Sequence, residues 1–189
     1  MKSKYKITFT NFFKHLHTIN KHRFKVFILC TKVGIPIHGL IHDLSKYSPI
    51  EFLEGVKYFQ GNYSPIVNCK KENGYSLAWI HHKNHNKHHY EYWYDYESKI
   101  ETPIIPFKYF LEMLCDTLEA GQTYQGKKWT KEYQLTYWNE TKDKTKMNKN
   151  MKKLLDNIYK DISINGVNKV LNRKKLKILY NKYMNNICL

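Results

Sequence analysis

The sequence predicts an all-α protein, and three observations support this fold class. Apolar residues recur at three- and four-residue steps along most of the chain, which is the spacing of one helix face. No stretch alternates apolar and polar residues for long enough to predict a sheet. Glycine, proline and serine stand where these helical segments would begin or end. With 189 residues, the chain can bury a core without disulfides or structural metal.

The first helix is expected over about residues 10–33, where apolar residues follow helical spacing. Gly34 and then Pro36 provide its stop. A short helix is expected to follow over residues 37–46, and it would carry His42.

Ser48 and Pro49 suit the N-cap and first position of the next helix, which should end before Gly61. Residues 62–75 are expected to form a loop. Ser76 can then cap a helix that leads into a histidine-rich stretch.

The second half of the chain begins with an expected loop over residues 94–106, which contains two prolines. A strongly apolar helix should follow over residues 107–120 and end at Gly121. Two further helices are expected at about 147–163 and 168–184.

The histidines are concentrated in one part of the chain. All ten lie between His15 and His89, and five of them fall within residues 81–89. Imidazole is the commonest protein ligand for transition metals. This crowding predicts a metal site.

The adjacent pair His42 and Asp43 is the sharpest local feature. On one helix, both side chains can reach an ion, and a mixed nitrogen and oxygen set suits Fe, Mn or Zn. A pair cannot complete a coordination shell, so further ligands are needed from other predicted helices. His22, the 81–89 cluster and Asp116 are the candidates.

Several of these residues have simpler interpretations when each is taken alone. Lys46 follows His42 by one turn and can bind a substrate phosphate, but a lysine at a helix end also favours the helix dipole. His15 and His17 can be surface or packing residues. His38 can orient a ligand without binding metal itself.

The segment His-Asp-Leu-Ser-Lys at residues 42–46 resembles the HD-x-x-K element of the HD-domain superfamily. That superfamily is an all-helical fold, mostly of metal-dependent phosphohydrolases. Its order of an early histidine, a His-Asp pair, later histidines and a late aspartate is matched over roughly residues 20–120. The chain more closely resembles an uncharacterised bacterial and phage family marked by HDLSK, paired histidines after a tryptophan, and Glu-Met-x-x-Asp.

The resemblance implies a set of metal ligands that spans these motifs. They are His22, His42, Asp43, His81, His82, His88, His89 and Asp116. Asp43 would bridge two ions or bind one, and Asp116 would close the primary site. His81 or His82, together with His88 or His89, would build a second site. Asp43 and Lys46 are the implied catalytic residues, and Lys46 would contact phosphate.

The resemblance implies an HD-domain-like helical bundle over residues 1–138 that binds one or two divalent transition metal ions, Fe, Mn or Zn. It also implies a phosphohydrolase for a nucleotide or another small phosphate ester. An oxygen-using di-iron enzyme on the same scaffold is the first alternative. The sequence leaves the substrate, the metal identity and the oligomeric state open.

Residues 139–189 are expected to form a basic helical extension that is packed on or appended to this bundle. The net charge of the chain is +16, and residues 141–189 hold 13 Lys or Arg against three Asp or Glu. A basic surface attracts polyanions, so a nucleic-acid-binding module with structural metal is the second alternative. A lysine-rich composition bias is the simpler interpretation of the charge.

The cysteines and the N-terminal sequence favour a cytoplasmic protein, and the resemblance implies that it is bacterial or phage-encoded. The four cysteines are widely spaced, and Cys30 and Cys115 lie among apolar residues as expected for buried thiols. The N-terminus has no apolar segment typical of a signal peptide, and no membrane partner is expected.

Overall fold

The computed structural model describes residues 3–61 and 63–185, and in that part of the chain the structure is all-α, as predicted. The α-helices, in chain order, are α1 (Phe9–Lys32), α2 (Pro36–Ile41), α3 (Pro49–Tyr58), α4 (Pro65–Asn73), α5 (Leu77–His85), α6 (Phe107–Gln125), α7 (Tyr133–Thr141), α8 (Lys149–Asn165), α9 (Val167–Val170) and α10 (Arg173–Met184). Three short 3₁₀ turns join them: η1 (Leu44–Tyr47), η2 (Tyr90–Trp93) and η3 (Gly126–Lys128).

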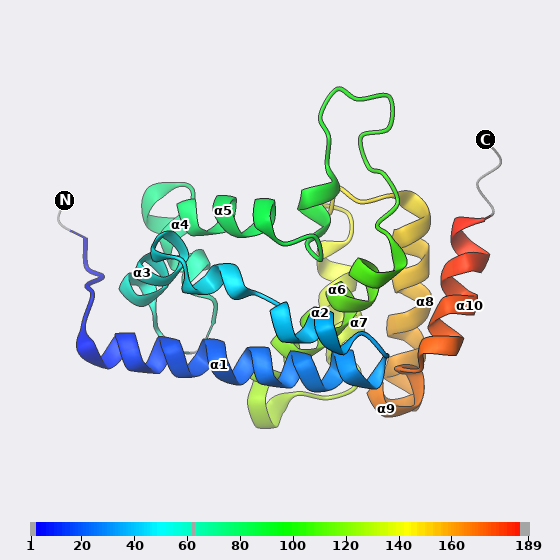
Figure 1. Ribbon diagram of the computed structural model, residues 1–189, viewed down its shortest axis with the longest axis horizontal. Helices are drawn as coiled ribbons and strands as arrows, with labels where there is room; N and C mark the ends of the chain where they lie inside the picture. Colours follow the sequence, from blue (N-terminus) through cyan, green and yellow to red (C-terminus); the bar gives the residue numbers. More distant parts are fainter. Residues whose placement is uncertain (1–2, 62, 186–189) are drawn as a thin grey trace.

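Helix α1 is the longest element and lies along the lower edge of Figure 1, where α2, α3 and α6 pack on it. The hydroxyl of Thr8 caps its first turn by accepting a hydrogen bond from the backbone N–H of Asn11. Its bounds agree with the prediction to within one residue at each end. Gly34 follows with a φ of +74°, and Pro36 begins α2, so both residues break the helix as expected.

Helices α3, α4 and α5 pack together over the first half of α1. Ser76 caps α5 as predicted, and its hydroxyl accepts a hydrogen bond from the Trp79 backbone N–H. Ser48 stands at the N-cap of α3, but its side chain makes no capping bond. The loop predicted over residues 62–75 is wrong, because Pro65 begins α4 and Gly74 ends it.

Helix α6 extends past Gly121, which was predicted to end it, and stops before Gly126. A Cβ at Gly121 would lie 2.8 Å from the side-chain oxygen of Gln134, so this glycine permits the close approach of α7. Helix α7 itself was not predicted. The helix expected over residues 168–184 is interrupted, since Asn172 caps α10 after the short α9.

The main hydrophobic core lies between α1, α6, α8 and α10, at the right of Figure 1. Val26, Leu114 and Leu154 are fully buried in it, and so are the thiols of Cys30 and Cys115, as predicted. Cys188 lies outside the described residues. Helices α8 and α10 share this core with α1 and α6, while the division of the chain at residue 139 stays a prediction.

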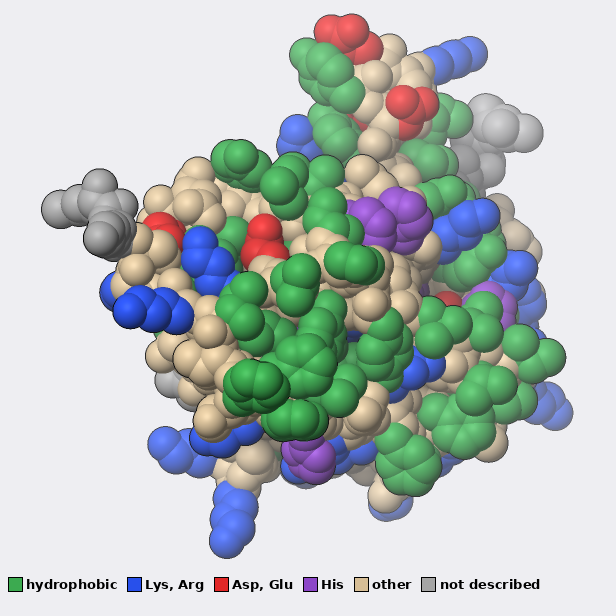
Figure 2. Space-filling view, turned by 60° about the vertical axis from the view of Figure 1, so that its left-hand side comes forward, with side chains coloured by type: hydrophobic (Ala, Val, Ile, Leu, Met, Phe, Trp, Pro, Cys, Tyr) green, Lys and Arg blue, Asp and Glu red, His purple; other side chains and the backbone are tan. Residues whose placement is uncertain are grey.

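A smaller apolar cluster joins α1 to α3 through Ile19, Phe52 and Val56. In Figure 2 the left-hand side of Figure 1 comes forward. Hydrophobic side chains gather near the middle of the visible face, and Lys and Arg lie mostly toward its edges. Within the described residues, no helix has both the length and the apolar character needed to cross a membrane.

Candidate metal centre

The His-Asp pair lies where the chain bends, between α2 and η1. The helix predicted over residues 37–46 is wrong in its second half, because α2 ends at Ile41 and His42 has an extended backbone (φ −50°, ψ 130°). Asp43 then takes a left-handed conformation (φ 54°), which aspartate tolerates better than most residues. Consecutive residues of a regular helix point about 100° apart. The bend instead brings both side chains into one buried site.

Four side chains from α1, the bend and α6 meet in a first group: His22, His42, Asp43 and Asp116. The Nε2 atom of His22 lies 3.1 Å from Asp116 Oδ1 and 3.6 Å from Asp43 Oδ2. The Nε2 atom of His42 lies 3.3 Å from Asp43 Oδ2 and 3.6 Å from Asp116 Oδ1. Ligands of a tetrahedral ion with bonds of about 2.1 Å lie roughly 3.4 Å apart, so this group has the size of a metal site.

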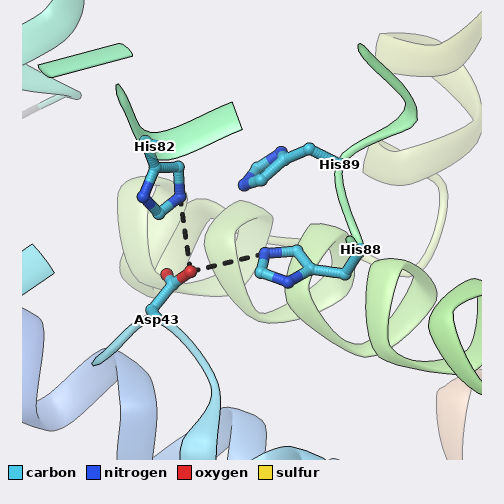
Figure 3. A group of neighbouring side chains, drawn as sticks. All are labelled: Asp43, His82, His88 and His89. Carbon is cyan, nitrogen blue, oxygen red and sulfur yellow. Dashed lines mark ion pairs between the residues drawn. The ribbon is translucent and has the colours of Figure 1, made fainter. Parts of the chain in front are cut away.

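A second group shares Asp43 and adds three histidines: His82, His88 and His89. Figure 3 shows the imidazoles of His82 and His88 directed at the carboxylate of Asp43. Asp43 Oδ1 lies 3.3 Å from His82 Nε2 and 3.4 Å from His88 Nε2. Asp43 therefore presents Oδ2 to the first group and Oδ1 to the second, as a carboxylate that bridges two ions would.

Three buried glutamates hold the imidazoles of the centre in orientation. Glu119 pairs with His22 Nδ1, and Glu51 Oε2 lies 2.7 Å from His82 Nδ1. Glu112 Oε1 lies 3.0 Å from His42 Nδ1 and 3.1 Å from His88 Nδ1. An ionised carboxylate only accepts hydrogen bonds, so each Nδ1 carries the proton. This arrangement directs Nε2 at the ion, as outer carboxylates do in protein metal sites.

The third possible group, formed by His42, His88 and Glu112, uses these same Nδ1 contacts. The Nε2 atoms of both rings already face Asp43. We therefore interpret Glu112 as the residue that orients the rings. Its other oxygen lies 3.0 Å from the Nδ1 of His38, so one glutamate contacts three histidines.

Three polar atoms of the centre are buried and lack a hydrogen-bond partner among the described residues: Asp43 Oδ1, His88 Nε2 and His89 Nε2. Buried polar atoms are rarely left without a partner, because desolvation is costly. All three belong to the second group, and a cation would satisfy them together. The donor set of imidazole nitrogens and carboxylate oxygens fits Fe, Mn or Zn. The centre can thus hold a metal ion.

The histidines and the lysine of the centre keep its aspartates ionised. Burial opposes the charge of Asp43 and Asp116, yet contacts with His42 and its neighbours hold both pKa values well below the usual range. Burial also opposes the charge of His22, but hydrogen bonds to Asp116, Asp43 and Glu119 raise its pKa to about 9. Binding of a cation at Nε2 must therefore displace protons from this centre.

A cavity of about 360 Å³ adjoins both groups. His22 and Asp116 of the first group line it, as do His82 and His89 of the second. Lys46 also lines the cavity, and its Nζ donates a hydrogen bond to Asp43 Oδ2. The predicted phosphate-binding lysine therefore lies between the centre and the open space.

Comparison with protein families gave a match over residues 11–161 to a family of unknown function, DUF5662. The chain belongs to the DUF5662 family. Every residue of the centre in this DUF5662 chain, from His22 to Glu119, lies within the matched range, whereas α9 and α10 follow it. Comparisons with curated proteins and with solved structures each gave no match.

The structure brings together seven of the eight predicted ligands and leaves His81 apart. His81 Nδ1 lies 2.6 Å from Glu51 Oε1, and its ring stacks on His85 at 3.9 Å between centroids. Helix α5 ends at His85, and Asn86 donates a hydrogen bond to the carbonyl of His82. His88 and His89 are therefore placed by the turn that follows and not by a continuous helix.

The role of the three glutamates was not predicted for this DUF5662 chain. Glu112, Asp116 and Glu119 are spaced by four and three residues, which puts them on one face of α6. Three carboxylates on one face of an otherwise apolar helix were a signal in the sequence. Glu51 carries no comparable signal, because nothing in the local sequence of α3 indicates that it meets α5.

Proposed function

We propose that this DUF5662 protein is a metal-dependent phosphohydrolase for a small phosphate ester, built on an HD-domain-like scaffold. The observation that supports the proposal most is the division of the Asp43 carboxylate between two groups of imidazoles beside a cavity. The order of His22, the His-Asp pair, the later histidines and Asp116 along the chain agrees with the HD pattern.

The residues of the centre have distinct parts in this proposal. His22, His42, Asp43 and Asp116 would hold one ion, and Asp43 with His82, His88 and His89 a second. Bound divalent ions would supply a Lewis acid for the phosphoryl oxygens and lower the pKa of water. Glu51, Glu112 and Glu119 keep the imidazole rings directed inward.

Lys46 has the position of a phosphate-binding group. Its contact with Asp43 keeps the ammonium at the edge of the cavity, and the charge of Asp43 contributes to a raised Lys46 pKa although burial opposes it. A fixed cation there would stabilise the charge that develops on a phosphoryl oxygen.

The test compares Lys46→Met with Lys21→Met, an exposed lysine of α1, in protein loaded with Fe, Mn or Zn. We expect Lys46→Met to retain metal but to lower kcat about 100-fold on a panel of phosphate esters, as loss of one charge-stabilising group does. Lys21→Met should hydrolyse like the wild type. Asp43→Ala should lose both metal and turnover. Hydrolysis by a metal-free Asp43→Ala protein would refute the mechanism.

A di-iron oxygenase is the second candidate, and the imidazole content of the second group favours it. Three histidines and one carboxylate form a nitrogen-rich set that suits iron. Iron analysis and Mössbauer spectra of anaerobically purified protein separate the two candidates. A coupled di-iron signal with substrate-dependent oxygen consumption would support the oxygenase, and turnover of phosphate esters without oxygen would support the hydrolase.

A further inference from the structure

The cavity beside the centre is small and mostly apolar. Its volume of about 360 Å³ is at the lower end of the range for ligand pockets. Ile19, Phe59, Ile66 and Trp79 are among its lining residues. It borders a more open surface hollow that Lys14 lines, and the two share Thr18, Phe59 and Gly61. The residues that would surround a bound molecule beyond the metal centre are therefore suited to an apolar body.

Aromatic side chains also line the more open part of this cavity. Tyr124 of α6 and Tyr137 of α7 are 41% and 47% exposed, and both line it. Tyr63 and Trp79 line it as well. Rings from three helices and the loop before α4 can contact a planar or apolar group through their faces and edges.

Lysine and arginine side chains are scarce in the cavity. Among the described residues that line it, Lys46 is the one lysine or arginine, and its ammonium is already paired with Asp43. Glu51 and Glu54 line the same space and add negative charge. Burial and the charge of Lys46 lower the pKa of His15 to about 4, so this imidazole adds no cation near neutral pH.

These features limit the number of phosphate groups that the cavity can accept. One phosphate beside the metal centre would meet Lys46 and the bound cations. A second or third phosphate would extend away from Lys46 toward Ile66 and Trp79, where the described residues offer no further lysine or arginine in the cavity lining. Lys70 lies over the Trp79 ring, 5.1 Å from its centroid, but it does not line the cavity. Desolvation of an uncompensated anion is unfavourable, as it is for other buried ions.

We propose that the ligand of this cavity carries a single phosphate on an uncharged, largely apolar body, and that nucleoside di- and triphosphates are excluded. The inference rests on the proposed function for the reaction itself, but it concerns recognition and can be tested by binding alone. The recognised class is thus a phosphate monoester of an apolar alcohol or phenol.

The experiment measures binding of two non-hydrolysable probes to metal-loaded protein by calorimetry. Naphthyl phosphonate represents one phosphate on an apolar body, and an imido analogue of ATP represents a polyphosphate. We expect the wild type to bind naphthyl phosphonate at least tenfold more tightly. Equal affinities, tighter binding of the ATP analogue, or no binding of either probe would overturn the inference.

Two adjacent residues of α4 provide a matched pair of variants. Ile66 lines the cavity, whereas Val67 is 41% exposed and does not. Ile66→Lys should reduce the preference for naphthyl phosphonate about tenfold by giving the cavity a cation, and Val67→Lys should leave it unchanged. Ile66→Ala serves as a second variant, and it should weaken only naphthyl phosphonate. If a folded Ile66→Lys protein kept the wild-type preference for naphthyl phosphonate, the proposed role of the apolar cavity lining would be contradicted.

Binding and turnover separate this inference from the proposed function. Selective binding of naphthyl phosphonate without hydrolysis of any phosphate ester would support the inference and refute the hydrolase. Hydrolysis that favours ATP over naphthyl phosphate would support the hydrolase and refute the inference.

Discussion

Glu112 lies outside the two proposed coordination groups and contacts three histidines of the centre and its surroundings. One of its oxygens contacts the Nδ1 atoms of His42 and His88, and the other contacts His38. Burial opposes its ionisation, but the hydrogen bonds from His42 and His88 lower its pKa to about 2. The negative charge is therefore retained at every pH at which the protein would be assayed, and it makes both imidazoles better metal ligands.

Glu112→Gln tests this positioning role. The substitution keeps the shape of the side chain but removes the charge, and one of its oxygens becomes an N–H₂ donor that cannot accept from an imidazole N–H. We expect metal affinity to fall about 10- to 100-fold, as when outer carboxylates are lost. Competition with a fluorescent chelator measures the change. Glu140→Gln on the exposed side of α7 is the control, and equal affinities in the two variants would contradict the role.

His81 and His82 form a natural pair of variants, because both Nδ1 atoms contact Glu51 while only the Nε2 of His82 faces Asp43. His82→Ala should lower the metal content by one ion per chain. His81→Ala should keep the wild-type metal content, because His81 does not face Asp43. Both variants lose a contact with Glu51, so the difference between them reports the loss of a proposed metal ligand. Elemental analysis by mass spectrometry gives the two numbers. Equal metal loss in both variants would show that Glu51 and not coordination accounts for the effect.

At the scale of elements, the sequence predicts helices with a clear apolar stripe and misses breaks that depend on tertiary contacts. Helix α1 was predicted closely because its stripe and its stop signals are local. Helix α4 is short and polar, so its only signals in the sequence are Pro65 at its start and Gly74 at its end. The bend at His42 and Asp43 was not predicted, because residues 37–46 have an acceptable helical pattern and the bend is stabilised by side chains from α1, α5 and α6.

Helix α6 was also predicted too short for this reason. Glycine often ends a helix, but Gly121 lies inside α6. Gly121→Ala should test its packing role. In an open helix this substitution stabilises by about 1 kcal/mol. Here the new methyl group would meet Gln134 and Tyr133 of α7, at 2.8 Å and 3.0 Å, so we expect destabilisation of about 1–3 kcal/mol. Urea denaturation measures it, and Gln134→Ala should relieve part of the cost in the double variant. A more stable Gly121→Ala protein would contradict the proposed contact.

At the scale of the whole molecule, the centre lies between the main core and the smaller cluster of α1 and α3. Leu114, two positions before Asp116, is fully buried in the main core, and Ile19, three positions before His22, lies in the smaller one. The ligands are thus attached to both apolar clusters. The sequence singled out seven of the residues that the structure brings together, because their order along the chain is distinctive. It did not predict their partners Glu51 and Glu119, since these contacts exist only after α1, α3, α5 and α6 have packed.

Because the centre lies between both apolar clusters, we expect metal binding to affect the stability of the fold. The pKa values determine whether stability rises or falls with pH. Burial opposes the charge on His22, but its carboxylate partners raise its pKa to about 9, so its ion pairs stabilise the metal-free protein fully below the unfolded value of about 6.5. That contribution is lost as the pH rises through about 9. Glu112, with a pKa of about 2, contributes fully above the unfolded value of about 4.3, and its contribution is lost only as the pH falls toward 2.

We therefore expect the metal-free protein to lose stability as the pH rises from about 6.5 to about 9. Metal binding requires an unprotonated Nε2, so its affinity increases over the same window. A ligand that binds only the folded state stabilises by an amount that grows with its affinity. The difference in Tm between metal-loaded and metal-free protein should thus widen with pH, as measured by scanning calorimetry with and without chelator. A difference that stays constant or narrows across this window would mean that the cation does not bind at the imidazoles of this centre.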